Sequence, residues 1–193
     1  MPRKYESSQP AQYQRIPSHT RDEAWIKKFL QTAEIGHLAH SQDDQPFVTP
    51  TNFWYDEAKH RIILHSNIAG RMRDNLERNP KVCLETSEYG RFLPANTALE
   101  FGIQYRSVMV YGKIEVISET GDATEALYGL LKKYFPAMQP GREYRPITPQ
   151  EMARTTVYAI QIDSWSGKEN WDEQAEELTD WPPLPDEIKK GKM

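Results

Sequence analysis

Residues 47–66 read FVTPTNFWYDEAKHRIILHS and contain two β-rich runs separated by a polar turn. The runs at 47–55 and 61–65 are rich in β-branched and aromatic residues, and DEAKH between them has the composition of a turn. Strands joined by so short a connection pair antiparallel, because a parallel crossover needs a dozen or more residues. The stretch therefore predicts a hairpin within an antiparallel meander.

Pro50 lies inside the first of these runs. Proline has no backbone N–H to give to a neighbouring strand, so two explanations stay open. One is a bulge or an unpaired position, which turns the backbone toward a ligand. The other is an edge strand, where the missing donor would face outward.

The same composition recurs along the chain and indicates the fold class. Thr20 and Glu23 form the two ends of a capping box, and apolar residues at helical spacing follow them. The further strand signals lie at 36–40, 81–86, 107–118 and 155–163, and the helix signals at 21–33, 68–78 and 122–134. Together with the first hairpin, they predict a mainly β protein, a six-stranded antiparallel barrel with short peripheral helices.

The chain divides into three parts by composition. Residues 1–18 are polar with three prolines and predict an extended N-terminal arm, and residues 19–167 hold the barrel domain. Residues 168–193 carry eight acidic and four basic residues, so the net charge of this tail equals the −4 of the whole chain. We expect a largely solvated acidic C-terminal tail, with Trp171 and Trp181 favouring the docking of part of it.

The net charge, the hydropathy and the cysteine count of the chain exclude several classes of protein. A net charge of −4 over 193 residues gives no general footprint for nucleic acid. No apolar run reaches the roughly 20 residues that cross a bilayer, and the first residues lack the apolar stretch of a signal peptide, so we expect a cytoplasmic protein without a membrane partner. Cys83 is the only cysteine, which excludes an intramolecular disulfide and a cysteine-rich zinc site.

The stretch 62–80, IILHSNIAGRMRDNLERNP, places two arginines where a strand gives way to a helix. If the helix begins near Asn67 as N-cap, its first turn offers free N–H groups and a partial positive charge to an anion. Gly70 allows close approach, and Arg71 supplies a forked cation suited to phosphate. This combination predicts a mononucleotide phosphate site.

An ordinary solvated helix start is the alternative for the same stretch. Arg73 and Glu77 stand four residues apart and would form a surface ion pair on such a helix. Other phosphate motifs are absent, since the chain has neither a P-loop nor a dinucleotide-binding glycine pattern. His37 and His40 are three apart in a strand and so face opposite sides, and we expect no metal site.

Four runs in order resemble a known family: PFVTPTNFWYD, RIILHSNIAGR, NLERNPKVCLE and YRSVMVYGKIEVIS. Over roughly residues 20–167 the chain resembles the FMN-binding split-barrel flavoproteins related to pyridoxamine 5′-phosphate oxidase. It is most similar to their nitroimidazole-resistance (Nim-type) branch. The resemblance implies a split barrel and a homodimer with FMN bound at the interface.

The resemblance also implies roles for single positions. It places the flavin ring along residues 49–52 and near the strand end at 65–66, with the phosphate at Arg71. It makes Ser107 a flavin-contact candidate and directs Trp165 to the flavin of the partner subunit. The predicted cofactor-binding residues are Thr49, Pro50, Thr51, Asn52, His65, Ser66, Gly70, Arg71, Met72, Ser107 and Trp165.

The chain departs from the oxidases of that family where they carry cations. Met72 stands in place of their second basic residue, and Val48 and Phe53 replace a strand arginine and lysine. Trp171 and Glu173 stand where the oxidases place an arginine and a histidine on their substrate. A site for an anionic substrate would keep such cations, so pyridoxamine 5′-phosphate oxidase activity is the less favoured interpretation.

We therefore expect an FMN-dependent oxidoreductase that reduces a small planar substrate, for example a nitroaromatic one. No catalytic acid or base is assigned. The alternative is a non-catalytic flavin- or haem-binding protein on the same barrel, with His65 as the axial candidate for haem.

Overall fold

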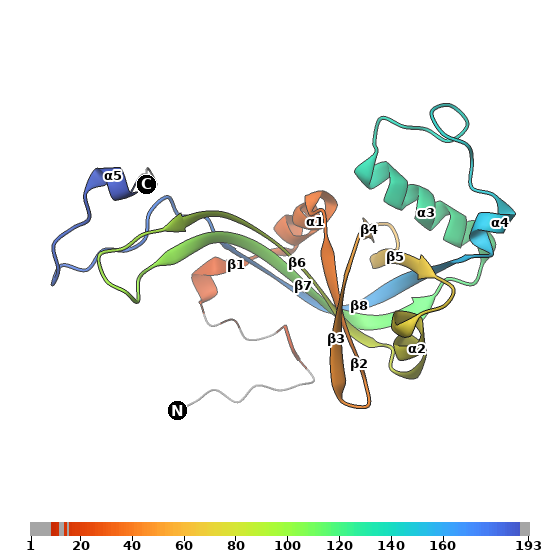
Figure 1. Cartoon of the computed structure of the whole chain (residues 1–193), viewed down its shortest axis with the longest axis horizontal. Coiled ribbons are helices and arrows are strands. Elements are labelled where there is room, and N and C mark those ends of the chain that lie inside the picture. The colour runs from red at the N-terminus through yellow and green to blue at the C-terminus, as the bar shows by residue number, and fades with distance from the viewer. Residues whose placement is uncertain (1–8, 12–13, 15, 190–193) are drawn as a thin grey trace.

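The computed structural model describes residues 9–11, 14 and 16–189. Most of the arm expected at 1–18 lies outside these residues, so that expectation stays a prediction. Figure 1 shows a strongly twisted sheet with helices around one part of it and a long ribbon extending from the other.

One antiparallel sheet contains every strand of the described residues. Its order is β3-β2-β6-β7-β8-β5-β4, with β1 paired to β8, and the sheet does not close into a complete barrel. The strands are β1 (Thr20–Arg21), β2 (Gly36–Gln42), β3 (Gln45–Thr51), β4 (Trp54–Asp56), β5 (Arg61–Asn67), β6 (Lys81–Leu93), β7 (Gly102–Val116) and β8 (Thr155–Asn170). The mainly β antiparallel class is confirmed.

The sheet has eight strands where the sequence predicted six. The run expected at 47–55 divides into β3 and β4, because Asn52 and Phe53 leave the ladder and the backbone N–H of Phe53 donates to the Tyr134 hydroxyl at 3.0 Å. The eighth strand is β1, whose two residues pair with β8. Both differences come from contacts between distant parts of the chain.

Pro50 lies on an edge strand. β3 ends the sheet order, and its pairing with β2 runs without a shift from Gly36↔Thr51 to Gln42↔Gln45. The edge-strand explanation is therefore confirmed and the bulge explanation is wrong. Since a proline cannot donate, its place at an edge leaves no ladder bond unmade.

Three helix starts differ from the expected ones at 21, 68 and 122. The helices are η1 (Pro17–His19), α1 (Glu23–Thr32), α2 (Arg71–Arg78), α3 (Thr120–Tyr134), α4 (Pro149–Met152) and α5 (Asp186–Lys189). Asp22 rather than Thr20 caps α1, accepting from the Trp25 N–H at 2.8 Å, because Thr20 is engaged in β1. None of the described helices is long and apolar enough to cross a membrane.

The main core lies between the twisted sheet and α1. Phe29 and Leu30 of α1 pack against Leu38, Leu64 and the other fully buried side chains of the sheet. Burying a side chain of this size stabilises the fold by about 1.5–3 kcal/mol. A smaller cluster beneath α3 includes Ala123 and Ala126.

The outer parts of β6 and β7 form the ribbon, and the acidic tail lies along it (Figure 1). β8 continues to Asn170, three residues past the expected end of the barrel domain at 167. The Asn96 side chain then binds the tail at two points, accepting from the Leu178 N–H at 3.0 Å and donating to the Trp181 carbonyl at 3.1 Å. Part of the tail is thus docked, as its tryptophans indicated.

An ion-pair network fastens the β4–β5 hairpin to α3. The buried Arg61 guanidinium donates to Asp56 at 2.9 Å and to Asp122 at 2.6 and 2.9 Å. Lys59 also donates to Asp122, at 2.6 Å. These cations hold the pKa of the Asp122 carboxyl well below its ordinary value, Arg61 contributing most.

Asp122→Asn should lower the free energy of unfolding by about 1–3 kcal/mol at pH 7, because it weakens charge-assisted bonds to a buried guanidinium. A carboxyl with a lowered pKa in the fold stabilises above its unfolded pKa of about 3.9, and this contribution is lost as the pH falls. The difference in the free energy of unfolding between the wild-type and variant proteins should therefore become smaller below pH 4. Denaturation with urea at several pH values measures it.

Glu125→Gln is the matched control for this measurement. Glu125 also approaches Lys59, at 3.7 Å, but its side chain is 75% exposed. Its loss should leave the unfolding midpoint unchanged, since exposed pairs contribute little. Equal effects of the two substitutions would contradict the structural importance of the Asp122 network.

Candidate functional site

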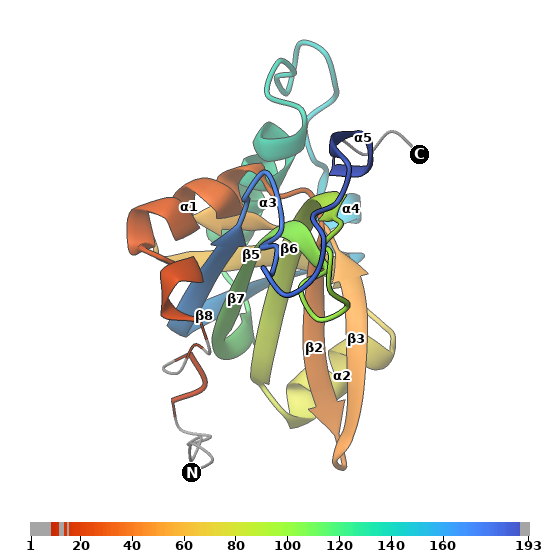
Figure 2. The same cartoon turned by 90° about the vertical axis from the view of Figure 1, so that its left-hand side faces the viewer.

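The predicted residues lie in two groups, one on the β2–β3 hairpin and at the start of α2, the other near the end of β5. Figure 2 shows α2 beside the β2–β3 hairpin. α2 is held to β2 by two side-chain bonds, Asn75 Nδ2 to His40 Nδ1 at 3.1 Å and Asn79 Nδ2 to Ser41 Oγ at 2.9 Å. Both bonds come from beyond the first turn, so they hold the middle and the C-terminal end of α2 against β2.

The helix α2 begins at Arg71, later than the sequence predicted. Gly70 precedes it with a φ of 137° and a ψ of 164°, which is not helical and which side chains rarely adopt. Asn67 is not the N-cap, because its Oδ1 accepts from the Ala69 N–H at 3.1 Å, outside the helix. Within the described residues no side chain caps α2, so the first N–H groups of the helix face outward.

The two arginines in the first turn of α2, Arg71 and Arg73, differ in their partners. Arg73 donates to Glu77 at 2.8 Å, as predicted, and also to Thr156 Oγ1 at 2.8 Å. Arg71 has neither an ion pair nor a hydrogen bond to any described residue, and its Cζ lies 5.4 Å from the centroid of the Phe47 ring. Arg71 is thus the cation of this helix that is available to an anion.

The edge strand β3 supplies the second part of the site. In an edge strand every other residue turns its N–H and C=O away from the sheet, so this backbone can bond a planar ligand. The Thr49 hydroxyl lies 3.2 Å from His40 Nε2, which ties it to β2. Thr51 Oγ1 instead donates to the Asn52 carbonyl at 3.0 Å.

His65 and Ser66 lie near the end of β5. Ser66 Oγ donates to the Asn67 carbonyl at 2.8 Å and to the Tyr158 hydroxyl at 3.3 Å. Neither ring nitrogen of His65 bonds to a described residue, and its Nδ1 is buried. Burial lowers the pKa of His65, so the imidazole is neutral at pH 7.

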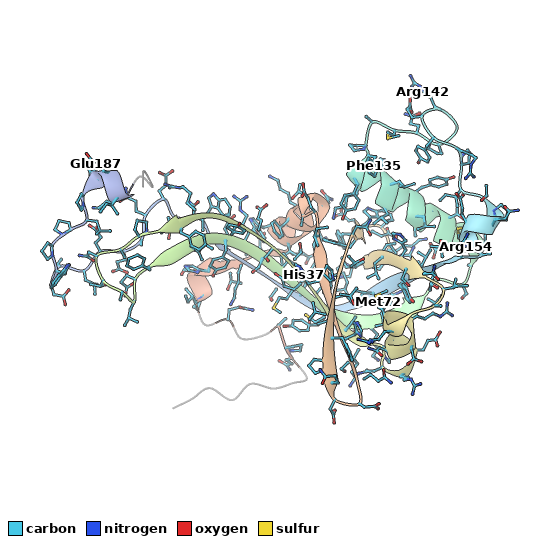
Figure 3. The ribbon with its side chains drawn as sticks, in the orientation of Figure 1. His37, Met72, Phe135, Arg142, Arg154 and Glu187 are labelled. Atoms are coloured by element: carbon cyan, nitrogen blue, oxygen red, sulfur yellow. The ribbon has the colours of Figure 1, made fainter. Side chains whose placement is uncertain are left out.

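A cavity of about 480 Å³ opens between β5, α3 and the segment that leads to α4. Its polar lining includes His65 and Asn52, with Arg145 and Glu151 bonded to each other at 2.7 Å. Figure 3 labels Phe135, at the end of α3 that borders the cavity. The apolar lining comes from Leu127, Leu130, Leu131, Phe135 and Ile147.

The end of α3 also fixes the turn between β3 and β4. The Lys133 ammonium donates to the carbonyls of Leu30 and Phe53 at 3.1 and 2.9 Å, and burial lowers the pKa of Lys133 to about 8. The Tyr134 hydroxyl is bonded to both backbone groups of Phe53. Asn52 is therefore presented to the cavity on a rigid turn.

Three predicted residues lie apart from these groups within the chain. Met72 packs against the main core, whereas Arg71 is exposed. Ser107 pairs with Ser87 and with Lys168 at the base of the ribbon.

The ring of Trp165, the third of these residues, lies in an aromatic cluster of its own chain. It is 4.8 Å from His60 and 5.6 Å from Tyr55, measured between ring centroids. The placement of Trp165 against a partner subunit's flavin stays a prediction.

The sequence did not single out three residues that organise the site, namely His40, Phe47 and Asn75. His40 and Phe47 are stacked with their ring centroids 5.6 Å apart, and Asn75 of α2 is fully buried. The alternation of residues 36–40 did predict that His40 and His37 lie on opposite faces of the strand, and His40 lies on the buried face. The partner on α2 could not be read from that pattern.

Metal and thiol chemistry find little support here. The described residues contain no group of three His, Cys, Asp or Glu side chains placed to hold a metal ion. Burial raises the pKa of the Cys83 thiol to about 11, so this cysteine stays protonated. The groups that the described residues offer to a ligand are edge-strand backbone, the free Arg71 guanidinium and the apolar cavity walls.

The open sheet and its peripheral helices define a protein of the split-barrel class. The sequence profile of the family described as pyridoxamine 5′-phosphate oxidase matches residues 21–169. Because the match covers well over half of the chain, this protein belongs to that family. No curated protein matches the chain.

Solved structures from other organisms share this fold. The flavocytochrome Anf3 of Azotobacter vinelandii is 27% identical with a TM-score of 0.70, over 93% of this chain and 78% of that one. The FAD and haem binding protein of Mycobacterium smegmatis is 22% identical with a TM-score of 0.70, over 89% and 78%. A proposed 5-nitroimidazole antibiotic resistance protein of Bacteroides thetaiotaomicron is 21% identical with a TM-score of 0.65, over 77% and 84%.

Gly70→Ala should lower the free energy of unfolding by about 1–3 kcal/mol, because the backbone there adopts a conformation that only glycine occupies readily. Gly102→Ala is the matched control, since an added Cβ would meet its nearest neighbour at an ordinary 3.8 Å. The control should lose less than about 1 kcal/mol. Urea unfolding followed by circular dichroism compares the two, and equal losses would contradict the strain assigned to Gly70.

Proposed function

We propose that this protein binds a flavin, most specifically FMN, and uses it as a redox cofactor. The observation that carries the proposal is the start of α2, where uncapped N–H groups and the unpaired Arg71 guanidinium lie together. Helix N-termini and arginine side chains are strong binders of phosphate. Membership of the pyridoxamine 5′-phosphate oxidase family and the flavocytochrome neighbour support a flavin.

The start of α2 has both the room and the positive charge that a flavin phosphate requires. A Cβ built on Gly70 would meet no atom within 4 Å in the described part of the chain, so the approach to the helix start is open. Arg71 would bind the phosphate oxygens, and the N–H groups of the first turn would complete the contact. Met72 would contribute its backbone alone.

The flavin ring would lie along β3 and the end of β5. The outward backbone groups of residues 49–52 would bond the ring heteroatoms, and Pro50 would leave one position without a donor. His65 and Ser66 would border the ring and the ribityl chain. A bound flavin supplies one- or two-electron transfer, while these residues supply its position and polarity.

The substrate in this proposal is a small planar molecule. The cavity beside His65 and Asn52 has a volume of about 480 Å³, within the range of small-molecule sites, and its walls are apolar. A neutral imidazole and an amide at its polar end would orient the substrate by hydrogen bonds. No side chain is assigned as acid or base.

We further propose a homodimer in which the partner subunit completes the flavin site. Ser107 and Trp165 lie away from Arg71 within one chain, so their predicted flavin contacts need a second copy. The ribbon leaves large apolar side chains exposed, which supports its burial against a partner. These are Tyr89, Phe92, Leu99 and Phe101.

Arg71→Ala should raise the Kd for FMN at least about tenfold, because a charge-assisted contact of about 1.5–3 kcal/mol is lost. Riboflavin, which lacks the phosphate, should bind both proteins equally. Quenching of flavin fluorescence measures both affinities.

Arg73→Ala is the matched control on the same helix, since Arg73 already has protein partners. It should change the FMN affinity less than threefold. Unchanged FMN binding by the Arg71 variant would contradict the phosphate site.

Haem is the second candidate ligand, and His65 is the observation that favours it. Its imidazole is neutral, lacks a hydrogen-bond partner in the described residues and lines an apolar cavity. A neutral imidazole is a common axial ligand of haem iron. The 27% identical Anf3 is a flavocytochrome, so one chain of this fold can carry both cofactors.

His65→Ala should abolish the Soret band of protein purified with haem or reconstituted with haemin, because the iron loses its axial ligand. His37→Ala is the control, since His37 is bonded to Glu85 on the other side of β2. The Soret absorbance of the wild-type, His65→Ala and His37→Ala proteins measures this effect. A full Soret band in the His65 variant would contradict haem ligation at this residue.

A further inference from the structure

His40 lies at the centre of the contacts that join β2, β3 and α2. Its side chain is buried, with 5% of the residue exposed. One ring nitrogen faces Asn75 of α2 and the other faces Thr49 of β3, at 3.1 and 3.2 Å. Its ring is stacked on Phe47 with an angle of 14° between the planes.

The directions of the two His40 hydrogen bonds follow from its tautomer. With Asn75 Nδ2 as the donor, Nδ1 accepts and carries no proton. A neutral imidazole then has its proton on Nε2, which donates to Thr49 Oγ1. Because the Thr49 oxygen accepts this bond, its own O–H remains free to donate to a bound ligand.

The stacked ring of Phe47 links His40 to Arg71. The Arg71 guanidinium lies 5.4 Å from the centroid of Phe47, within the range of a cation–π contact. His40 supports this ring by stacking and so limits its rotation. Among the described residues, the Arg71 guanidinium is thus positioned by its contact with the Phe47 ring, and its N–H groups remain available to a ligand.

We propose that His40 is a positioning residue for the flavin phosphate. It holds the Thr49 hydroxyl as a donor and Phe47 as the platform for Arg71, and through Asn75 it joins α2 to β2. The inference rests on the proposed function, since it assumes that FMN places its phosphate at Arg71. The same phosphoryl group occurs in FAD, and either source would use these donors.

A histidine with a purely structural role would behave differently. Its loss would lower stability and weaken the binding of every flavin to a similar extent. A positioning role instead concerns the phosphate contact, so its loss should reduce the preference for FMN over riboflavin. The ratio of the two Kd values is therefore the readout, with the melting temperature measured alongside.

The experiment compares His40→Leu and His40→Gln with His37→Leu. The leucine variant should reduce the FMN preference at least fivefold. The glutamine variant should keep it within twofold, because its amide can accept from Asn75 and donate to Thr49. His37→Leu, on the opposite face of the same strand, should keep the full preference.

A second pair of variants keeps the test decisive if His40→Leu does not fold. Phe47→Leu should reduce the FMN preference at least threefold in the wild-type background and have no further effect beside Arg71→Ala. If Arg71→Ala leaves FMN binding unchanged, the proposed function fails. If Arg71→Ala weakens FMN binding but Phe47→Leu and every folded His40 variant keep the full preference, the positioning role of His40 is overturned.

Discussion

The conformation of Gly70 is the constraint on which the proposed site depends. With a φ of 137°, the chain leaves β5, makes a sharp change of direction and starts α2 at Arg71 without a capping side chain. A residue with a side chain would need to strain the backbone or start the helix elsewhere. Because the helix starts here, its free N–H groups and the unpaired Arg71 guanidinium lie together and can bind the same phosphate.

The proposed site needs α2 and the β2–β3 hairpin to be held together. Side-chain contacts join them, not backbone hydrogen bonds of the sheet. His40 and Asn75 connect β2 to α2, while stacked Phe47 carries Arg71. α3 fixes the other end of β3 through bonds to Phe53. The site is thus built from a rigid edge with separate supports at its two ends.

Local patterns predicted the class of fold well, since alternation and turn composition are properties of neighbouring residues. They also separated Arg73, which pairs with Glu77, from Arg71. They placed the start of α2 too early, because Asn67 has the composition of a cap but bonds outside the helix. The role of His40 could not be predicted, since its partner Asn75 lies 35 residues along the chain.

The most direct measurement is the identity of the ligand carried by the native protein and the affinity of the stripped protein for it. We expect a flavin that carries a phosphoryl group, identified by its absorption and mass after release. The stripped protein should bind FMN at least tenfold more tightly than riboflavin. Equal affinity for FMN and riboflavin would rule out a phosphate site at the start of α2 and Arg71.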